Sequence, residues 1–159
     1  MTVVHGLKYR GWTGLAALMA QAMAGDARRL GDGGALRLVP VPLSSARRRE
    51  RGFNQARLIA DILGREIGWP VAELLRRPRT GRRQVGLGRE DRMANVAGRF
   101  RVEEMPPPAG RPVLLVDDVV TTGATAAACA AALHAAGVPC AGVVSFARSL
   151  GSLDGEEIL

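Results

Sequence analysis

The chain has 159 residues, of which 47% are hydrophobic and 4% aromatic, and its formal net charge is +7. This length is enough for one domain with a core of its own. No apolar run is long enough to cross a membrane, and the spacing of the two cysteines, Cys129 and Cys140, fits neither a disulfide framework nor a structural zinc site. We therefore expect a globular cytoplasmic protein that does not insert into membranes.

The first part of the chain predicts helix, loop and strand in that order. Apolar residues over 7–24, interrupted by glycines near 11–14, predict a helical region. The glycine-rich stretch 25–34 predicts a loop, and residues 36–41 predict a first strand that Pro42 ends.

The middle of the chain contains one clear helix and one long loop. Apolar residues at helical spacing predict a helix over 54–67, closed by Gly68. The polar, basic stretch 78–95 has no periodicity, and a loop of this length is typical of a functional or disordered segment. Three shorter features complete this region: a strand at 71–75, a strand at 99–102 and a proline-rich connection at 105–112.

The most informative segment is 113–125. Four apolar residues, 113–116, are typical of a strand covered on both faces, and Asp117 and Asp118 follow them. A Thr/Gly turn then leads into an alanine-rich helix over 124–136, and a last strand is expected at 141–146. Alternating strands and helices predict an α/β fold with a mostly parallel central sheet flanked by helices, in which this turn lies at the ligand-binding carboxyl edge.

The residue types in the turn suit a phosphorylated sugar. Backbone N–H groups and hydroxyls at a helix N-terminus bind phosphate, and the residues concerned are Thr121, Thr122, Gly123, Ala124 and Thr125. Asp117 and Asp118 would repel that phosphate, and suit a vicinal diol, a hard cation such as Mg²⁺, or both. A phosphate at one end and hydroxyls with Mg²⁺ at the other describe a phosphorylated ribose.

This segment resembles the phosphoribosyl-pyrophosphate (PRPP) motif of type I phosphoribosyltransferases. Other motifs resemble, in order, those of the ComF family, which includes proteins labelled GntX and is associated with competence for DNA uptake: Val39-Pro40-Val41-Pro42, Arg51-Gly52-Phe53-Asn54-Gln55-Ala56, Arg79-Thr80 with Gln84, and Arg92-Met93-Ala94-Asn95-Val96. ComF-like proteins commonly carry an N-terminal zinc ribbon. No Cys-x-x-Cys occurs in this sequence, so we expect either that the ribbon was lost or that the chain starts after it.

The resemblance implies a domain organisation and a set of site residues. A type I phosphoribosyltransferase-like domain is expected over 35–150, preceded by an N-terminal helical region over 1–34, a candidate remnant of a hood, and followed by a tail at 151–159.

Asp117 and Asp118 are the candidate catalytic residues, and would seat Mg²⁺ directly or through PRPP hydroxyls or water. Residues 121–125 would hold the 5′-phosphate. The candidate pyrophosphate-binding residues are Pro42, Leu43, Ser44, Ser45, Arg47 and Arg51. The candidates in a mobile loop that closes over PRPP are Arg79, Thr80, Gln84 and Arg92.

Two functions remain open at this level. The first is a Mg²⁺-dependent transfer of phosphoribosyl from PRPP to an unknown acceptor, with release of pyrophosphate. The second is a non-catalytic protein that binds PRPP or a nucleotide, or assists DNA uptake. Clustered arginines predict weak, salt-sensitive binding of single-stranded DNA, although few aromatic residues are present to stack on bases. A homodimer is a further expectation.

Overall fold

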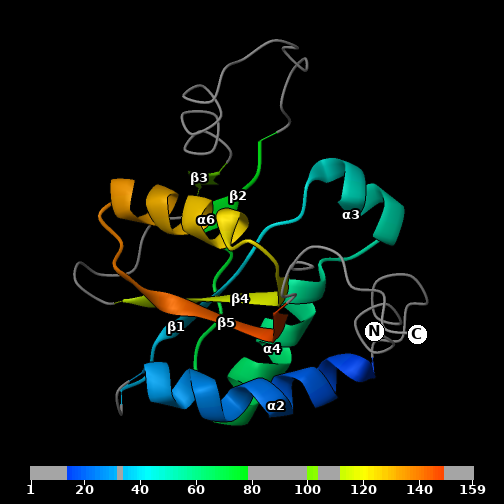
Figure 1. Ribbon diagram of the computed structural model, residues 1–159, viewed down its shortest axis with the longest axis vertical. Coiled ribbons are helices and arrows are strands. Elements are labelled where there is room, and N and C mark those ends of the chain that lie inside the picture. The colour runs from blue at the N-terminus through cyan, green and yellow to red at the C-terminus, as the bar shows by residue number, and fades with distance from the viewer. Residues whose placement is uncertain (1–13, 32–33, 79–99, 104–111, 149–159) are drawn as a thin grey trace, which may run out of the picture.

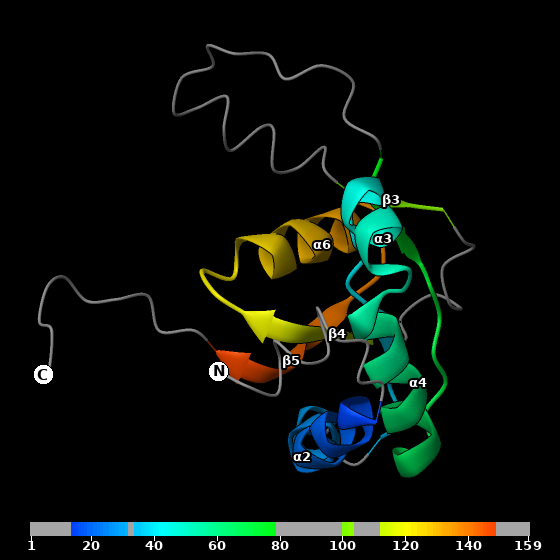
Figure 2. The same ribbon diagram turned by 90° about the vertical axis from the view of Figure 1, so that its right-hand side faces the viewer.

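A three-stranded parallel sheet lies at the centre of the computed structural model, which describes residues 14–31, 34–78, 100–103 and 112–148 (Figure 1). The strand order is β1 (Arg37–Pro40), β4 (Val113–Val120) and β5 (Cys140–Arg148). Helices α2 (Leu15–Leu30) and α4 (Gln55–Ile67) cover one face, and α6 (Ala124–Ala135) covers the other (Figure 2). The predicted α/β class with a mostly parallel sheet flanked by helices is confirmed, and the arrangement fits a type I phosphoribosyltransferase-like fold.

The first half of the central strand β4, residues 113–116, is continuously apolar because it is covered on both faces. Leu114 and Val116 are fully buried in the cluster formed with α2 and α4. Val113 and Leu115 are buried in a second cluster with α6, because successive side chains of a strand point to opposite faces. A strand covered on both faces therefore needs an apolar residue at every position.

The two helices on the first face begin and end differently. Asn54 caps α4, since its Oδ1 accepts a hydrogen bond from the Ala56 amide at 3.1 Å, and Gly68, with φ 75°, ends it. Helix α2 continues to Leu30, so the loop predicted from residue 25 onward is wrong. Burial of Met23, Ala24 and Ala27 against the sheet outweighs the cost of about 1 kcal/mol that Gly25 imposes on a helix interior.

The strands also differ in extent from the sequence prediction. β4 runs four residues further than expected, to Val120, so the two acidic residues belong to the strand. The strand predicted at 71–75 is largely wrong: Val71 makes only an isolated parallel bridge to Leu38. Pairing occurs instead between β2 (Leu75–Arg76) and β3 (Arg101–Val102), which are antiparallel.

Several predictions fall on residues outside the described ranges. They concern the start of the N-terminal helical region, most of the proline-rich connection, the tail at 151–159, and the loop candidates Arg79, Thr80, Gln84 and Arg92. The domain boundaries accordingly stay predictions. Among the described helices, none has both the length and the apolar character needed to cross a membrane.

Candidate functional site

A cavity of about 360 Å³ lies at the carboxyl ends of β1 and β4. It brings together residues that are far apart in the sequence and that were selected as candidates for three different parts of a ligand: Pro42, Leu43, Arg47, Arg51, Asp117, Asp118, Thr121 and Thr125. The volume is in the range of small-ligand sites. Ser44, Thr122, Gly123 and Ala124 belong to the same connections but do not line this cavity.

The acidic pair is divided between the two faces of the sheet. Asp117 continues the series of β4 residues that face α6, and Asp118 continues the series that faces α2 and α4. The Asp118 amide donates to Oδ1 of Asp117 at 2.9 Å, and the Val119 amide donates to Oδ1 of Asp118 at 2.9 Å. Both carboxylates nevertheless line the cavity.

These two carboxylates fit a cation that arrives with a ligand. Mg²⁺ takes six oxygen ligands and usually keeps some as water or substrate oxygens. The part of the chain that the structure describes has no group of three or more acidic, histidine or cysteine side chains placed to hold a metal ion. Within the described part of the chain, Asp117 and Asp118 would need ligand oxygens or water to complete a Mg²⁺ site.

The N-terminus of α6 forms the second wall of the site. Gly123 adopts a left-handed conformation, with φ 77°, and so turns the chain from β4 into the helix. The Thr122 hydroxyl accepts from the Ala124 amide at 3.4 Å. Thr121 and Thr125 are exposed and line the cavity. Amides and hydroxyls at the positive end of a helix dipole favour an anion such as phosphate.

A short helix, α3 (Ser45–Arg51), carries the arginines of the site. Its N-cap is Ser44, whose hydroxyl accepts from the Arg47 amide at 3.3 Å, and Gly52, with φ 78°, ends it. No helix was predicted over these residues from the sequence. Because the segment is helical, Arg47 and Arg51 are four residues apart on one face, and both line the cavity.

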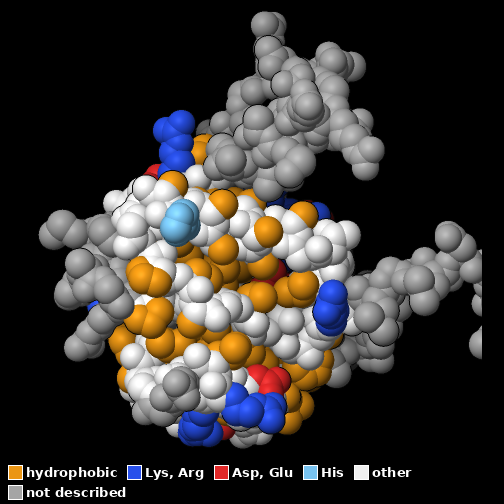
Figure 3. Space-filling model, turned by 60° about the vertical axis from the view of Figure 1, so that its left-hand side comes forward, with side chains coloured by type: hydrophobic (Ala, Val, Ile, Leu, Met, Phe, Trp, Pro, Cys, Tyr) orange, Lys and Arg blue, Asp and Glu red, His pale blue; other side chains and the backbone are white. Residues whose placement is uncertain are grey.

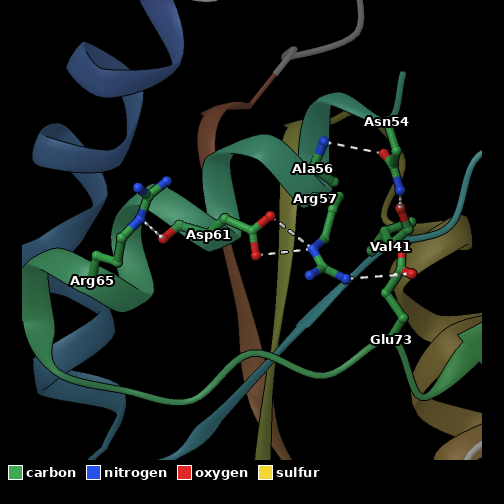
Figure 4. Close-up of polar contacts among 7 residues, drawn as sticks. All are labelled: Val41, Asn54, Ala56, Arg57, Asp61, Arg65 and Glu73. Carbon is green, nitrogen blue, oxygen red and sulfur yellow. Dashed lines mark hydrogen bonds and ion pairs between the residues drawn. The ribbon is translucent and has the colours of Figure 1, made fainter. Parts of the chain in front are cut away.

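The structure adds three polar residues to this cavity that the sequence analysis did not select: Asn54, Gln55 and Arg77. Asn54 donates through Nδ2 to the Val41 carbonyl at 3.1 Å, which ties the start of α4 to the end of β1 (Figure 4). The Arg77 guanidinium lies 5.7 Å from the centre of the Phe100 ring. The sequence predicted that a helix begins at Asn54. No local sequence pattern indicated that the chain brings Arg77 to this cavity.

An ion-pair network links α4 to the segment that leads into β2 (Figure 4). The Arg57 Nε donates to both oxygens of Asp61, at 2.8 and 2.9 Å, and Nη1 lies 3.3 Å from a Glu73 oxygen. These side chains are about one-third exposed, so the pairs orient the segment more than they stabilise the fold. Glu73 also lines a neighbouring cavity of about 110 Å³, which shares Pro42, Leu43 and Arg77 with the main one.

The two thiols do not contribute a nucleophile to the site. Burial, reinforced by the nearby Asp117 carboxylate, raises the pKa of Cys129 to about 12. Burial also raises the pKa of Cys140. Both groups are therefore protonated at neutral pH, and a thiol is a far weaker nucleophile than a thiolate.

The parallel sheet, with an acidic pair and a helix N-terminus at its carboxyl edge, defines an α/β protein of the phosphoribosyltransferase-like class. No family model matches the chain. The chain is similar to DNA utilization protein YhgH of Salmonella typhi, with 36% identity over 133 residues that cover 77% of this chain and 56% of that protein. It is also similar to Competence protein F of Haemophilus influenzae, with 38% identity over 93 residues (55% of this chain, 39% of that protein).

A third relative is Competence protein ComFC of Bacillus subtilis, with 33% identity over 88 residues that cover 55% of this chain and 34% of that protein. These similarities support the assignment of the chain to the ComF family. It spans about half the length of the YhgH protein and between one third and two fifths of the other two.

Proposed function

We propose that this protein is a Mg²⁺-dependent phosphoribosyltransferase that binds PRPP and transfers its phosphoribosyl group to an acceptor still to be identified. One observation carries the proposal. A single cavity holds an acidic pair suited to ribose hydroxyls, hydroxyls at a helix N-terminus suited to the 5′-phosphate, and two arginines suited to a diphosphate. These three chemistries, in one place, match the three parts of PRPP.

Each part of the site has a role in this reaction. The bond between C1 of the ribose and the pyrophosphate oxygen breaks, and C1 forms a bond to the acceptor. Arg47 and Arg51 stabilise the negative charge that develops on the departing pyrophosphate. Asp117 and Asp118 hold the ribose hydroxyls, and the start of α6 fixes the 5′-phosphate, so the sugar is oriented for attack. Bound Mg²⁺ supplies further neutralisation of the pyrophosphate charge.

A second candidate function is the binding of single-stranded DNA. The observation that favours it is that α3 carries three exposed arginines, Arg47, Arg48 and Arg49, of which Arg47 lines the cavity. Relatives named for DNA utilization and competence agree with such a role, and by analogy we extend it to this chain as a proposal. DNA binding through α3 is compatible with PRPP binding in the cavity.

The substitution Asp118→Asn tests the proposed function, because it keeps the shape of a side chain that is only 8% exposed and removes its charge. We expect PRPP to bind at least tenfold more weakly, since hydrogen bonds to a charged group are lost. Binding of single-stranded DNA should remain unchanged or become slightly tighter. Isothermal titration calorimetry measures the first, and fluorescence anisotropy with a labelled oligonucleotide measures the second.

Asp26→Asn is the matched control, because Asp26 lies on α2, outside the cavity. This variant should bind PRPP like the native protein. Equal PRPP affinity of the native protein and Asp118→Asn would contradict the role given to the acidic pair. If the native protein binds PRPP, a separate assay identifies the acceptor class. It measures the release of pyrophosphate from PRPP in the presence of a panel of bases and amines.

A further inference from the structure

Gln55 is the most deeply buried polar side chain of the cavity, and the proposed function so far gives it no role. It is the first residue of α4 and is 1% exposed. A buried carboxamide is costly unless its oxygen and both of its N–H groups find partners. The hydrogen bonds of Gln55 therefore indicate what the cavity is built to receive.

The orientation of this carboxamide follows from its neighbour Arg51. The distance between Nη1 of Arg51 and Oε1 of Gln55 is 3.4 Å. A guanidinium group only donates hydrogen bonds, so the carboxamide must turn its oxygen toward it. The amide nitrogen Nε2 then faces away from Arg51. Nε2 is buried and has no hydrogen-bond partner among the described residues.

The surroundings of this amide favour an anionic acceptor. Gln55 opens a helix of 13 residues, whose N-terminus carries partial positive charge from the helix dipole. Two arginines, Arg47 and Arg51, line the same cavity as Gln55. A helix N-terminus, a buried donor without an acceptor and two guanidinium groups converge on one space. A phosphate oxygen would satisfy the donor.

We propose that Gln55 binds the pyrophosphate moiety of the ligand: its Nε2 group donates to a phosphate oxygen, while its Oε1 holds Arg51 in place beside the same moiety. This inference rests on the proposed function and extends it, because it places pyrophosphate at the start of α4. The 5′-phosphate remains at the start of α6. The two anionic ends of PRPP are thus received by two different helix N-termini.

Two substitutions separate donation to the ligand from simple positioning of Arg51. Gln55→Glu keeps an oxygen facing Arg51 but removes the donor and adds negative charge beside the ligand. Gln55→Met has a similar length and removes both functions. Gln21→Glu makes the same chemical change at an exposed position of α2 and serves as the matched control.

The experiment is calorimetric titration of Mg²⁺-pyrophosphate, ribose 5-phosphate and PRPP into the native protein and the three variants. We expect Gln55→Glu and Gln55→Met each to weaken pyrophosphate and PRPP binding at least tenfold. Both variants should bind ribose 5-phosphate like the native protein, which also shows that they are folded. Gln21→Glu should bind all three ligands like the native protein.

Other outcomes would overturn the inference. If Gln55→Glu binds pyrophosphate as tightly as the native protein, Gln55 does not donate to it, although the proposed function stands if native PRPP binding is intact. If both Gln55 variants lose ribose 5-phosphate affinity to the same degree as pyrophosphate affinity, the residue acts on the fold and the inference is wrong. If the native protein binds neither PRPP nor pyrophosphate, the proposed function and this inference both fail.

Discussion

Asp117 influences more than the proposed ligand, because it lies on the α6 side of β4 and its charge reaches Cys129. Burial of the thiol, followed by this carboxylate, raises the pKa of Cys129 from 9.0 to about 12. The thiol is therefore kept neutral in the folded protein over a pH range in which the unfolded chain ionises. The resulting stability is complete below pH 9 and is lost as the pH rises toward 12.

This linkage predicts a pH-dependent free energy of unfolding. Through Cys129 the native protein should lose about 0.7 kcal/mol per pH unit near pH 9, and this slope should approach about 1.4 kcal/mol per pH unit near pH 10.5. The variant Cys129→Ala should lose less stability over the same range, although it starts from a lower value because a buried sulfur is removed. Urea unfolding at several pH values in the presence of a reducing agent measures both slopes. Parallel slopes for the two proteins would show that Cys129 does not titrate in this way.

The sequence predicted the kind of chemistry at the site better than it predicted which residues line the cavity. Asp117, Asp118 and the 121–125 turn follow one another along the chain, so a local pattern was enough to select them. Gln55 and Arg77 were missed for a different reason. Gln55 was noted only as part of a motif that resembles the family's, and Arg77 lies among other arginines. Only the return of α4 and of the end of β2 to the edge of the sheet brings them into the cavity.

Among the elements, helices with an apolar face were predicted and the one without such a face was not. Helix α4 buries Ala56, Ile59 and Leu63, and this spacing is visible in the sequence. Helix α3 is built almost entirely from arginine, serine and glutamate, so hydrophobic periodicity could not reveal it. Its signals are its caps, Ser44 and Gly52. Strand β4 was predicted at the right position but too short, because its pairing with β5 continues through Asp117 to Val120.

Two helical glycines provide a prediction at this scale. Gly25 is exposed in α2, and a Cβ added there would meet nothing within 4 Å. Gly64 is buried in α4, and its Cβ would lie 2.7 Å from the Trp69 carbonyl oxygen and 2.8 Å from Cγ2 of Val71. Gly25→Ala should raise the free energy of unfolding by about 0.5–1 kcal/mol, because alanine is the better helix former. Gly64→Ala should lower it by about 1–3 kcal/mol through overpacking.

The same urea unfolding measurement checks both variants, and each serves as the other's control. If both substitutions raise the free energy of unfolding, helix propensity decides the outcome, and the close approach of α4 to the segment before β2 is not important. Opposite signs would support the packing seen between Gly64, Trp69 and Val71.

On the scale of the whole molecule, charge and apolar surface are distributed unevenly. The face that carries α6, β5 and α2 gathers hydrophobic side chains (Figure 3). β5 is an edge strand of its sheet there, and Leu18 and Leu30 of α2 are 57% and 40% exposed. A second copy of the chain would cover such a face, and the homodimer expected from the sequence stays a prediction.

The exposed arginines of α3 predict how DNA binding depends on salt. In Figure 1, α3 lies at the upper right, far from the end of α2. Arg48→Ala with Arg49→Ala should weaken binding of single-stranded DNA, because two exposed cations are removed. The slope of log K against log salt concentration should become shallower by about 0.7 for each DNA phosphate that the protein no longer neutralises. Fluorescence anisotropy at several salt concentrations measures this slope.

Arg28→Ala with Arg29→Ala is the matched control, since it removes the same charge from exposed positions at the end of α2. Equal slopes for the two double variants would mean that net charge alone attracts DNA and that α3 has no special part. Neither double variant changes the acidic pair or the start of α6.

The cavity at the carboxyl edge of the sheet is proposed to bind PRPP together with Mg²⁺. The measurement that tests it most directly is isothermal titration of PRPP into the native protein, with Mg²⁺ and with a chelator. We predict saturable binding of one PRPP per chain that is markedly weaker in the chelator, because the carboxylates of Asp117 and Asp118 repel the diphosphate unless a cation offsets their charge. Absence of binding at millimolar PRPP in the presence of Mg²⁺ would contradict the account.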